Sequence, residues 1–190
     1  KEKFAEIPEK EVLTEILQSD MENIRGTMES LEKDTFSMAA ELIQNAKKIY
    51  IVGIRSCEPL ADFLGFYLNM LFDEVHVVRT NSASEIFEQL MRIGAGDVLI
   101  GISFPKYSMR TVKAMELANS RSAGVISITD SIHSPLNLYS SCNLIARSEM
   151  ASVVDSLTAP LSVINALIVA LCLKNQDSLK QSIETLDQLY

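Results

Sequence analysis

Two short segments of the sequence combine hydroxyl, thiol and cationic side chains in a spacing that suits an anion. The first contains Gly53, Arg55, Ser56 and Cys57, and Pro59 follows at a position typical of a first helical turn. A helix N-terminus presents unpaired backbone N–H groups, and nearby hydroxyls add donors, so such a segment can bind a phosphate dianion. A structural role fits equally well, with Gly53 in a tight turn and Ser56 or Cys57 capping the helix.

The second segment, residues 103–108, places two serines five positions apart around a cation and a phenol. Ser103 and Ser108 bracket Pro105, Lys106 and Tyr107. One hydroxyl can lie at a strand end and the other at a helix start around one anion, while Lys106 adds a point charge and Tyr107 a phenol. In the alternative interpretation, Ser108 is only an N-cap and Pro105 only a turn residue.

The sequence lacks the residues that a nucleotide-binding loop, a metal site or a catalytic cysteine would need. Neither segment is a dinucleotide-binding or Walker-type loop, because the later glycines and the G-K-[ST] ending are missing. Cys57, Cys142 and Cys172 show no paired metal-ligand spacing. Neither His76, in an apolar strand, nor His133, in a predicted turn, can be placed beside Cys57 as a base. We therefore expect no metal and no cofactor, and we interpret Cys57 as a small buried thiol.

The elements that position these segments follow from the order of apolar runs. From residue 48 onward, short apolar runs alternate with amphipathic segments of helix length, as in βαβ units whose parallel sheet is covered on both faces. The predicted strands are residues 48–53, 74–79, 97–103, 124–129 and 142–146. The predicted fold is a three-layer α/β/α arrangement around a five-stranded parallel sheet of flavodoxin-like order. Ligands in such sheets bind beyond the carboxyl ends of the strands at the point where the strand order reverses, which for this order lies between strands one and three, where both segments follow.

Residues 10–46 carry a helical pattern that precedes the sheet. Val12, Ile16 and Ile24 belong to an apolar stripe at three- and four-residue spacing, and a second helix is predicted through Phe36 and Ile43. Neither helix can bury its stripe alone, so both must pack on the following domain or on another subunit. We predict a helical connector or dimerisation extension over residues 1–46, an α/β domain over residues 47–190, and a homodimer or tetramer.

The composition of the chain limits which binding partners and which cellular compartment we expect. The 190 residues are 47% hydrophobic, enough for one substantial core, and the net charge is −8 without a basic run, so no DNA binding is expected of this chain by itself. The apolar stretch 157–173 is shorter than a membrane span and is interrupted by polar residues and Pro160, which indicates a buried core helix. The charged start lacks the apolar region of a signal peptide, and a reducing cytoplasmic location is expected.

Three segments of the chain resemble a known family. IYIVGIRSCEPLA, GDVLIGISFPKYSMRTVKAMELA and GVISITDSIHSPL are similar to the SIS (sugar isomerase) fold of phosphosugar-binding proteins, and ISFPKYS is most similar to the RpiR type of transcriptional regulator. In that type a helix-turn-helix domain precedes the SIS domain. The resemblance implies an effector domain that senses a sugar phosphate or a related phosphorylated metabolite. It also implies that DNA is bound only through a helix-turn-helix domain that is not present in this chain.

The first loop departs from the family pattern, which is commonly G-x-G-x-S. Gly53 matches the first glycine, whereas Arg55 stands at the second and Cys57 at the serine. Arg55 either pairs with a phosphate or obstructs its usual position. Ser56 is the residue that would replace the missing hydroxyl donor.

The second loop departs from the S-x-S-G-x-T pattern that isomerases of the fold more often carry. Ser103 and Ser108 match the outer hydroxyls, while Pro105 and Lys106 replace the middle serine and the glycine. The sequence predicts that Ser103, Ser108 and Ser56 surround one anion. The candidate phosphosugar-binding residues are Gly53, Arg55, Ser56, Cys57, Ser103, Lys106, Tyr107 and Ser108.

Two other functions fit the same sequence. An aldose–ketose sugar-phosphate isomerase needs a base that moves a proton between adjacent carbons, and Glu149, after the fifth strand, is the candidate. A solvated loop glutamate explains Glu149 equally well. The other alternative is a dimerisation scaffold whose site has decayed, as the substitutions at Arg55, Cys57 and Lys106 suggest.

Overall fold

A computed structural model describes residues 7–79, 82–149 and 154–189 and contains one parallel five-stranded sheet. The strands are β1 (Ile49–Gly53), β2 (Val75–Val77), β3 (Val98–Ile102), β4 (Gly124–Thr129) and β5 (Cys142–Ile145). Their order is β2-β1-β3-β4-β5, and every neighbouring pair is parallel. This confirms the predicted sheet and its flavodoxin-like order. The edge strand β2 is shorter than predicted and only half-buried.

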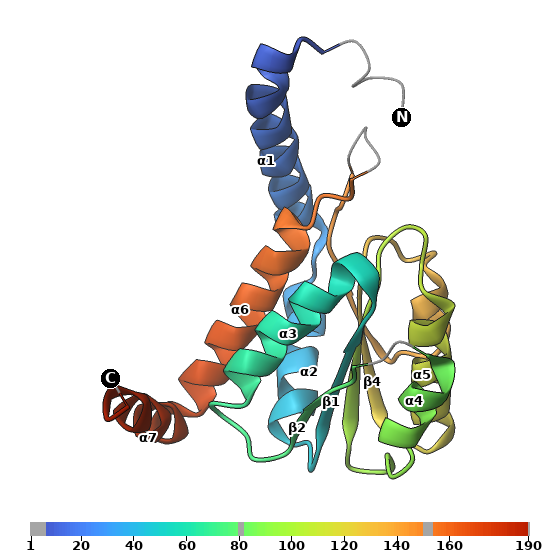
Figure 1. Cartoon of the computed structure of the whole chain (residues 1–190), viewed down its shortest axis with the longest axis vertical. Helices are drawn as coiled ribbons and strands as arrows, with labels where there is room; N and C mark the ends of the chain where they lie inside the picture. Colours follow the sequence, from blue (N-terminus) through green and yellow to red (C-terminus); the bar gives the residue numbers. More distant parts are fainter. Residues whose placement is uncertain (1–6, 80–81, 150–153, 190) are drawn as a thin grey trace.

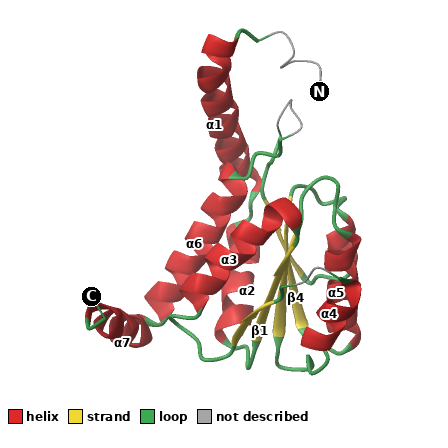
Figure 2. Cartoon of the chain, in the orientation of Figure 1, coloured by secondary structure: helices red, strands yellow, loops and turns green. Residues whose placement is uncertain are grey.

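Helices cover both faces of the sheet, as the continuous apolar runs of the strands predict (Figures 1 and 2). One face carries α2 (Lys33–Gln44), α3 (Glu58–Leu68) and α6 (Thr158–Lys174), and the other carries α4 (Ala83–Gln89) and α5 (Met109–Ser120). Successive side chains of a strand point to opposite faces. Ile51 of β1 therefore joins the core with α3 and α6, while its neighbours Tyr50 and Val52 join the core with α5.

The first helix, α1 (Val12–Ser30), extends beyond the sheet and packs on α6 (Figure 1). The amide of Asn23 donates to the carbonyl of Glu149 at 2.8 Å, and the hydroxyl of Thr27 accepts the backbone N–H of Arg147 at 2.9 Å. The free end of the helix exposes Leu13 by 70% and Met21 by 60%. The two helices of the predicted connector differ in how much apolar surface they bury. Helix α2 buries its apolar face on β5 and α6, whereas α1 leaves most of its apolar stripe exposed.

The helix predicted over the apolar stretch, α6, lies between α1, α2 and α3. It buries Val163, Leu167 and Leu171 and still exposes Val169 and Leu173 on its outer side. A last helix, α7 (Gln176–Asp187), follows as predicted. Among the described helices none is long and apolar enough alone to cross a bilayer, and α6 and α7 reach the required length only as a pair bent by 102°. The division of the chain at residue 46 stays a prediction.

Candidate functional site

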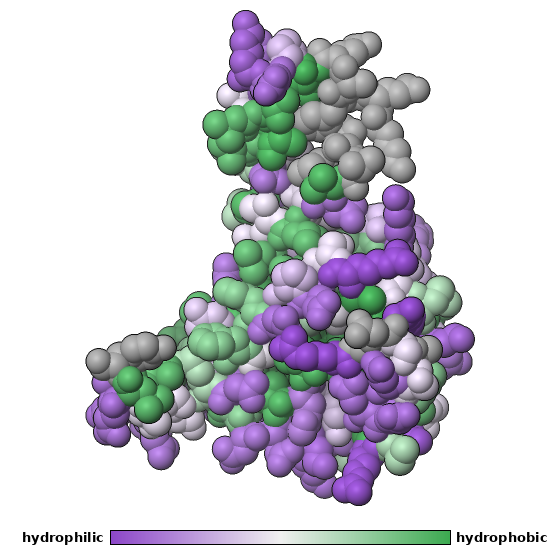
Figure 3. Space-filling model, viewed as in Figure 1, coloured by the Kyte–Doolittle hydropathy of each residue, from purple (hydrophilic) through white to green (hydrophobic). Residues whose placement is uncertain are grey.

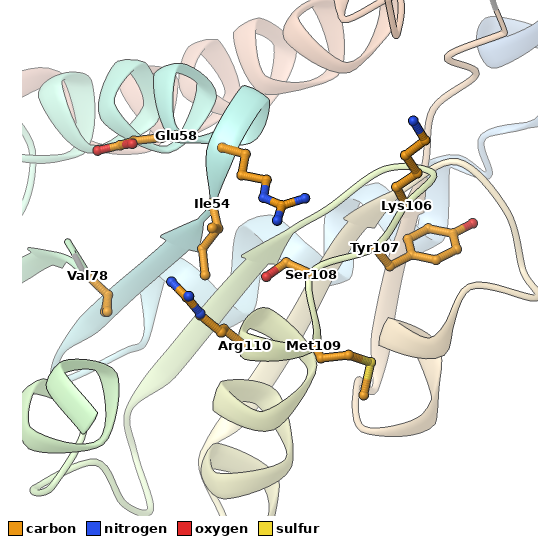
Figure 4. A pocket seen from close by; sticks show the side chains of 10 residues that line it. Ile54, Glu58, Val78, Lys106, Tyr107, Ser108, Met109 and Arg110 are labelled. Carbon is orange, nitrogen blue, oxygen red and sulfur yellow. The ribbon is translucent and has the colours of Figure 1, made fainter. Parts of the chain in front are cut away.

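A cavity of about 420 Å³ opens where β1 and β3 end side by side (Figure 4). The short 3₁₀ turn η3 (Arg55–Cys57) leads from β1 into α3, and the loop 103–108 leads from β3 into α5. This is the point at which the strand order reverses, the usual ligand position in open parallel sheets. The lining residues are Gly53, Ile54, Arg55, Glu58, Val78, Lys106, Tyr107, Ser108, Met109 and Arg110.

The first loop is held by backbone packing and a buried thiol. A Cβ atom at Gly53 would lie 2.4 Å from the carbonyl oxygen of Cys57, so the sharp return of the chain into η3 requires glycine. Cys57 is 4% exposed, and burial is the main cause that raises the pKa of its thiol to about 11. Cys57 and Phe104 of the second loop belong to the same buried core cluster. Cys57 therefore packs the two loops together and is not a nucleophile at neutral pH.

The two serines of the second loop have different environments. Ser103 is 4% exposed, and its hydroxyl oxygen accepts the backbone N–H of Ser108 at 3.0 Å, which closes the loop. Ser108 occupies the N-cap position of α5, but its side chain makes no cap hydrogen bond and has no hydrogen-bond partner in the described part of the chain. In Figure 4 its hydroxyl points into the space beside Ile54. Ser108 is thus available to a ligand, whereas Ser103 supports the loop.

Tyr107 fastens the second loop to the end of β4. Its hydroxyl donates to the Oδ1 atom of Asp130 at 2.7 Å, and burial followed by this hydrogen bond raises the pKa of the phenol to about 12. Thr129 donates to Ser134 at 2.9 Å, and the Ser134 hydroxyl accepts the N–H of Leu136 at 3.3 Å. The segment after β4 therefore forms the turn that the sequence indicates, and the Tyr107 hydroxyl is already committed to it.

The cavity carries an excess of positive charge. Arg55, Lys106 and Arg110 line it with a single carboxylate, Glu58, whose side chain points away from Ser108 and Lys106 in Figure 4. Within the described residues, neither Arg55 nor Lys106 forms an ion pair. In a chain of net charge −8, this local concentration of cations at the N-terminus of α5 favours an anionic ligand. The described ranges contain no group of three or more His, Cys, Asp or Glu side chains that could hold a metal ion.

Two of these cations occupy backbone positions that favour glycine. Arg55 has φ 59° and Lys106 has φ 66°, both in the left-handed region. This conformation brings Cβ close to the following carbonyl oxygen and costs roughly 1–2 kcal/mol for a residue other than glycine. Ser122, with φ 62°, is the other such residue in the described ranges, and it lies at the far end of α5. The loops thus keep a glycine-type backbone while they present cationic side chains.

The model of the SIS domain family matches residues 42–170, from the end of α2 through nearly all of α6. The chain belongs to the SIS domain family. It is 27% identical over 186 residues to an uncharacterised helix-turn-helix-type transcriptional regulator of Caldanaerobacter subterraneus. That alignment covers 94% of this chain and 64% of the regulator, so the chain spans less than two thirds of this relative.

Solved structures share the fold of this SIS domain. The sugar isomerase domain of an RpiR transcription factor from Sphaerobacter thermophilus superposes with a TM-score of 0.88 at 23% identity, covering 94% of this chain and 99% of that one. The Vibrio vulnificus NanR protein complexed with ManNAc-6P gives a TM-score of 0.82 at 18% identity, covering 94% of this chain and 70% of that one. The SIS resemblance inferred from the sequence is confirmed.

The SIS domain brings only some of the predicted site residues together. Five of the eight line the cavity: Gly53, Arg55, Lys106, Tyr107 and Ser108. Ser56 is exposed and stands outside the lining, while Cys57 and Ser103 are buried behind it. Of the expected trio of Ser56, Ser103 and Ser108 around one anion, only Ser108 lines the cavity.

Two further residues concern the sequence interpretation: Glu149, for which a candidate base and a solvated loop residue were both open, and Arg110, which it did not name. Glu149 is exposed, lies outside the cavity lining, and contributes its backbone carbonyl to the anchoring of α1. Arg110 was not predicted, yet it lines the cavity, and in Figure 4 its guanidinium points toward Ile54. Its position in the first turn of the helix that follows Ser108 was the available signal, since that turn must face the crevice.

Proposed function

We propose that this SIS domain binds a sugar phosphate in the cavity beyond the carboxyl ends of β1 and β3, as the effector-binding domain of a transcriptional regulator. The observation that carries the proposal is the uncommitted Ser108 hydroxyl at the N-terminus of α5, in a cavity lined by three cations. A phosphate there would accept hydrogen bonds from the Ser108 hydroxyl and the first N–H groups of α5, with Arg110 as counter-charge. The sugar would extend toward Arg55 and Lys106.

The relatives support a regulatory role. One curated relative is a helix-turn-helix-type regulator, and the structural neighbours include an RpiR sugar isomerase domain and a NanR protein complexed with ManNAc-6P. We place the function in the cytoplasm, with DNA bound through a helix-turn-helix domain of a longer protein. Such a ligand regulates DNA binding only if it binds two subunit arrangements with different affinities.

The groups around the cavity favour sensing over isomerisation. Moving a proton between adjacent carbons requires a base near the sugar. Among the lining residues the carboxylate of Glu58 points away from Ser108, and the phenol of Tyr107 is bonded to Asp130. Glu149, the base suggested by the sequence, lies outside the lining. The site is thus equipped to hold an anion, which also favours it over a decayed scaffold.

The test is the substitution Ser108→Ala. Loss of one charge-assisted hydrogen bond of roughly 1.5–3 kcal/mol should weaken binding of N-acetylmannosamine 6-phosphate or another sugar phosphate by about ten- to a hundredfold. Isothermal titration calorimetry of the native chain first identifies a sugar phosphate that binds, and the variant is then titrated with it. Ser37→Ala, on the exposed side of α2, is the matched control and should bind like the native chain. Equal affinities of the Ser108 variant and the native chain would refute this site.

A further inference from the structure

The two cations held in left-handed conformations are the least explained feature of the cavity. Arg55 and Lys106 come from different loops, and both line the cavity. The family pattern commonly has glycine at the position of Arg55, and isomerases of the fold more often have glycine at that of Lys106; glycine adopts this backbone without strain. At both positions a glycine would avoid the backbone strain that the side chain causes. The presence of a charged side chain at each strained position of a ligand-sized cavity points to a function for the charge.

The positive charge around the cavity is larger than the negative charge of one phosphate group. Three cationic side chains line the cavity, the N-terminus of α5 adds about half a positive charge, and the single carboxylate, Glu58, points away. A phosphate monoester carries at most about two negative charges near neutral pH. Ser108, Arg110 and the α5 N–H groups already suit it. Arg55 and Lys106 are then left without an ion pair in the part of the chain that the structure describes.

We infer that Arg55 and Lys106 recognise a second anionic group of the ligand. The SIS domain then selects a sugar phosphate that also carries a carboxylate or a second phosphate over one whose sugar is neutral. A carboxylate or a second phosphate would give Arg55 and Lys106 the anionic partner that they lack among the described residues. A cavity of about 420 Å³ has the size of a small-molecule site. This inference rests on the proposed function and makes its ligand class more specific.

The experiment compares ligands that share one carbon skeleton. The native chain is titrated calorimetrically, at fixed ionic strength, with glucose 6-phosphate, gluconate 6-phosphate and glucose 1,6-bisphosphate. At least one of the two doubly anionic ligands should bind roughly tenfold or more tightly than glucose 6-phosphate, since each added ionic hydrogen bond contributes on that scale. The comparison of carboxylate with second phosphate identifies which group the cations accept.

Three glycine variants test whether Arg55 and Lys106 cause the preference for a doubly anionic ligand. Arg55→Gly and Lys106→Gly suit the left-handed backbone and remove the cationic side chain, so each should weaken binding of the doubly anionic ligand by a larger factor than binding of glucose 6-phosphate. Ser122→Gly is the matched control, because it makes the same exchange at φ 62° away from the cavity, and it should retain the full preference.

The outcomes separate this inference from the proposed function. Equal affinity for all three ligands, or a preference that survives in both Arg55→Gly and Lys106→Gly, overturns the inference and leaves the phosphate site in place. If glucose 6-phosphate, the two doubly anionic ligands and inorganic phosphate all fail to bind, the inference and the proposed function are both wrong.

Discussion

At the scale of single residues, the site depends on which polar groups are already used by the protein. Ser103 and Ser108 are five positions apart and chemically identical, yet one oxygen accepts a loop N–H and the other has no hydrogen-bond partner among the described residues. Tyr107 is likewise occupied by Asp130. The groups that remain for a ligand are the Ser108 hydroxyl, the N–H groups at the start of α5 and the cations.

The two serines should therefore respond differently to alanine. Ser103→Ala removes the acceptor of the Ser108 N–H and should lower the free energy of unfolding by about 1 kcal/mol. Ser108→Ala removes no intramolecular hydrogen bond and should change the free energy of unfolding by less than about 0.5 kcal/mol. Urea denaturation of both variants measures the difference. A larger loss of stability in the Ser108 variant than in the Ser103 variant would contradict these assignments.

The sequence could predict the location of the site but not the state of each group in it. The positions of the strands placed both loops at one edge, and the glycine patterns of the family marked Arg55 and Lys106 as substitutions. Whether Ser103 or Ser108 faces the cavity depends on loop closure, which the spacing does not encode. Cys57 was interpreted as a buried thiol from the absence of a nearby histidine, and its burial agrees with that.

At the scale of elements, α1 combines a fixed inner face with an uncovered outer one. Asn23 and Thr27 hold the helix to the segment that follows β5, and Gly26 lets it approach Arg147, whose side chain lies 2.5 Å from a Cβ built there. On the free part of the helix, apolar side chains gather at the surface (Figure 3). The most exposed are Leu13, Leu17, Met21 and Met28. Such a contiguous apolar surface is typical of an interface between subunits.

We predict that this face of α1 mediates homo-oligomer formation. Leu17→Glu combined with Met21→Glu would place two charges in the interface and should convert a dimer or tetramer into smaller species. The control, Gln18→Glu with Ser37→Glu, adds the same charge at exposed polar positions outside the apolar stripe and should keep the native assembly. Sedimentation velocity measures both. A native chain that sediments as a monomer at micromolar concentration would refute the prediction.

At the scale of the whole molecule, the alternation of apolar runs and helical segments was sufficient to predict the three-layer fold. Strands buried on both faces, such as β1 and β3, have nearly continuous apolar sequences, and right-handed connections restrict the orders in which they can pair. The placement of α1 could not be predicted in the same way. Its amphipathic pattern requires a partner surface but does not say whether that surface belongs to the same chain.

The central claim is that the cation-lined cavity beyond the carboxyl ends of β1 and β3 binds a phosphorylated sugar. A thermal-shift titration of the native chain with matched pairs of phosphorylated and unphosphorylated sugars tests it most directly. A ligand at a hundred times its Kd stabilises the folded state by about 2.7 kcal/mol, which should raise Tm by roughly 5 °C or more. We predict such a rise with at least one sugar phosphate and none with its unphosphorylated counterpart. A Tm that no phosphorylated sugar changes would contradict the account.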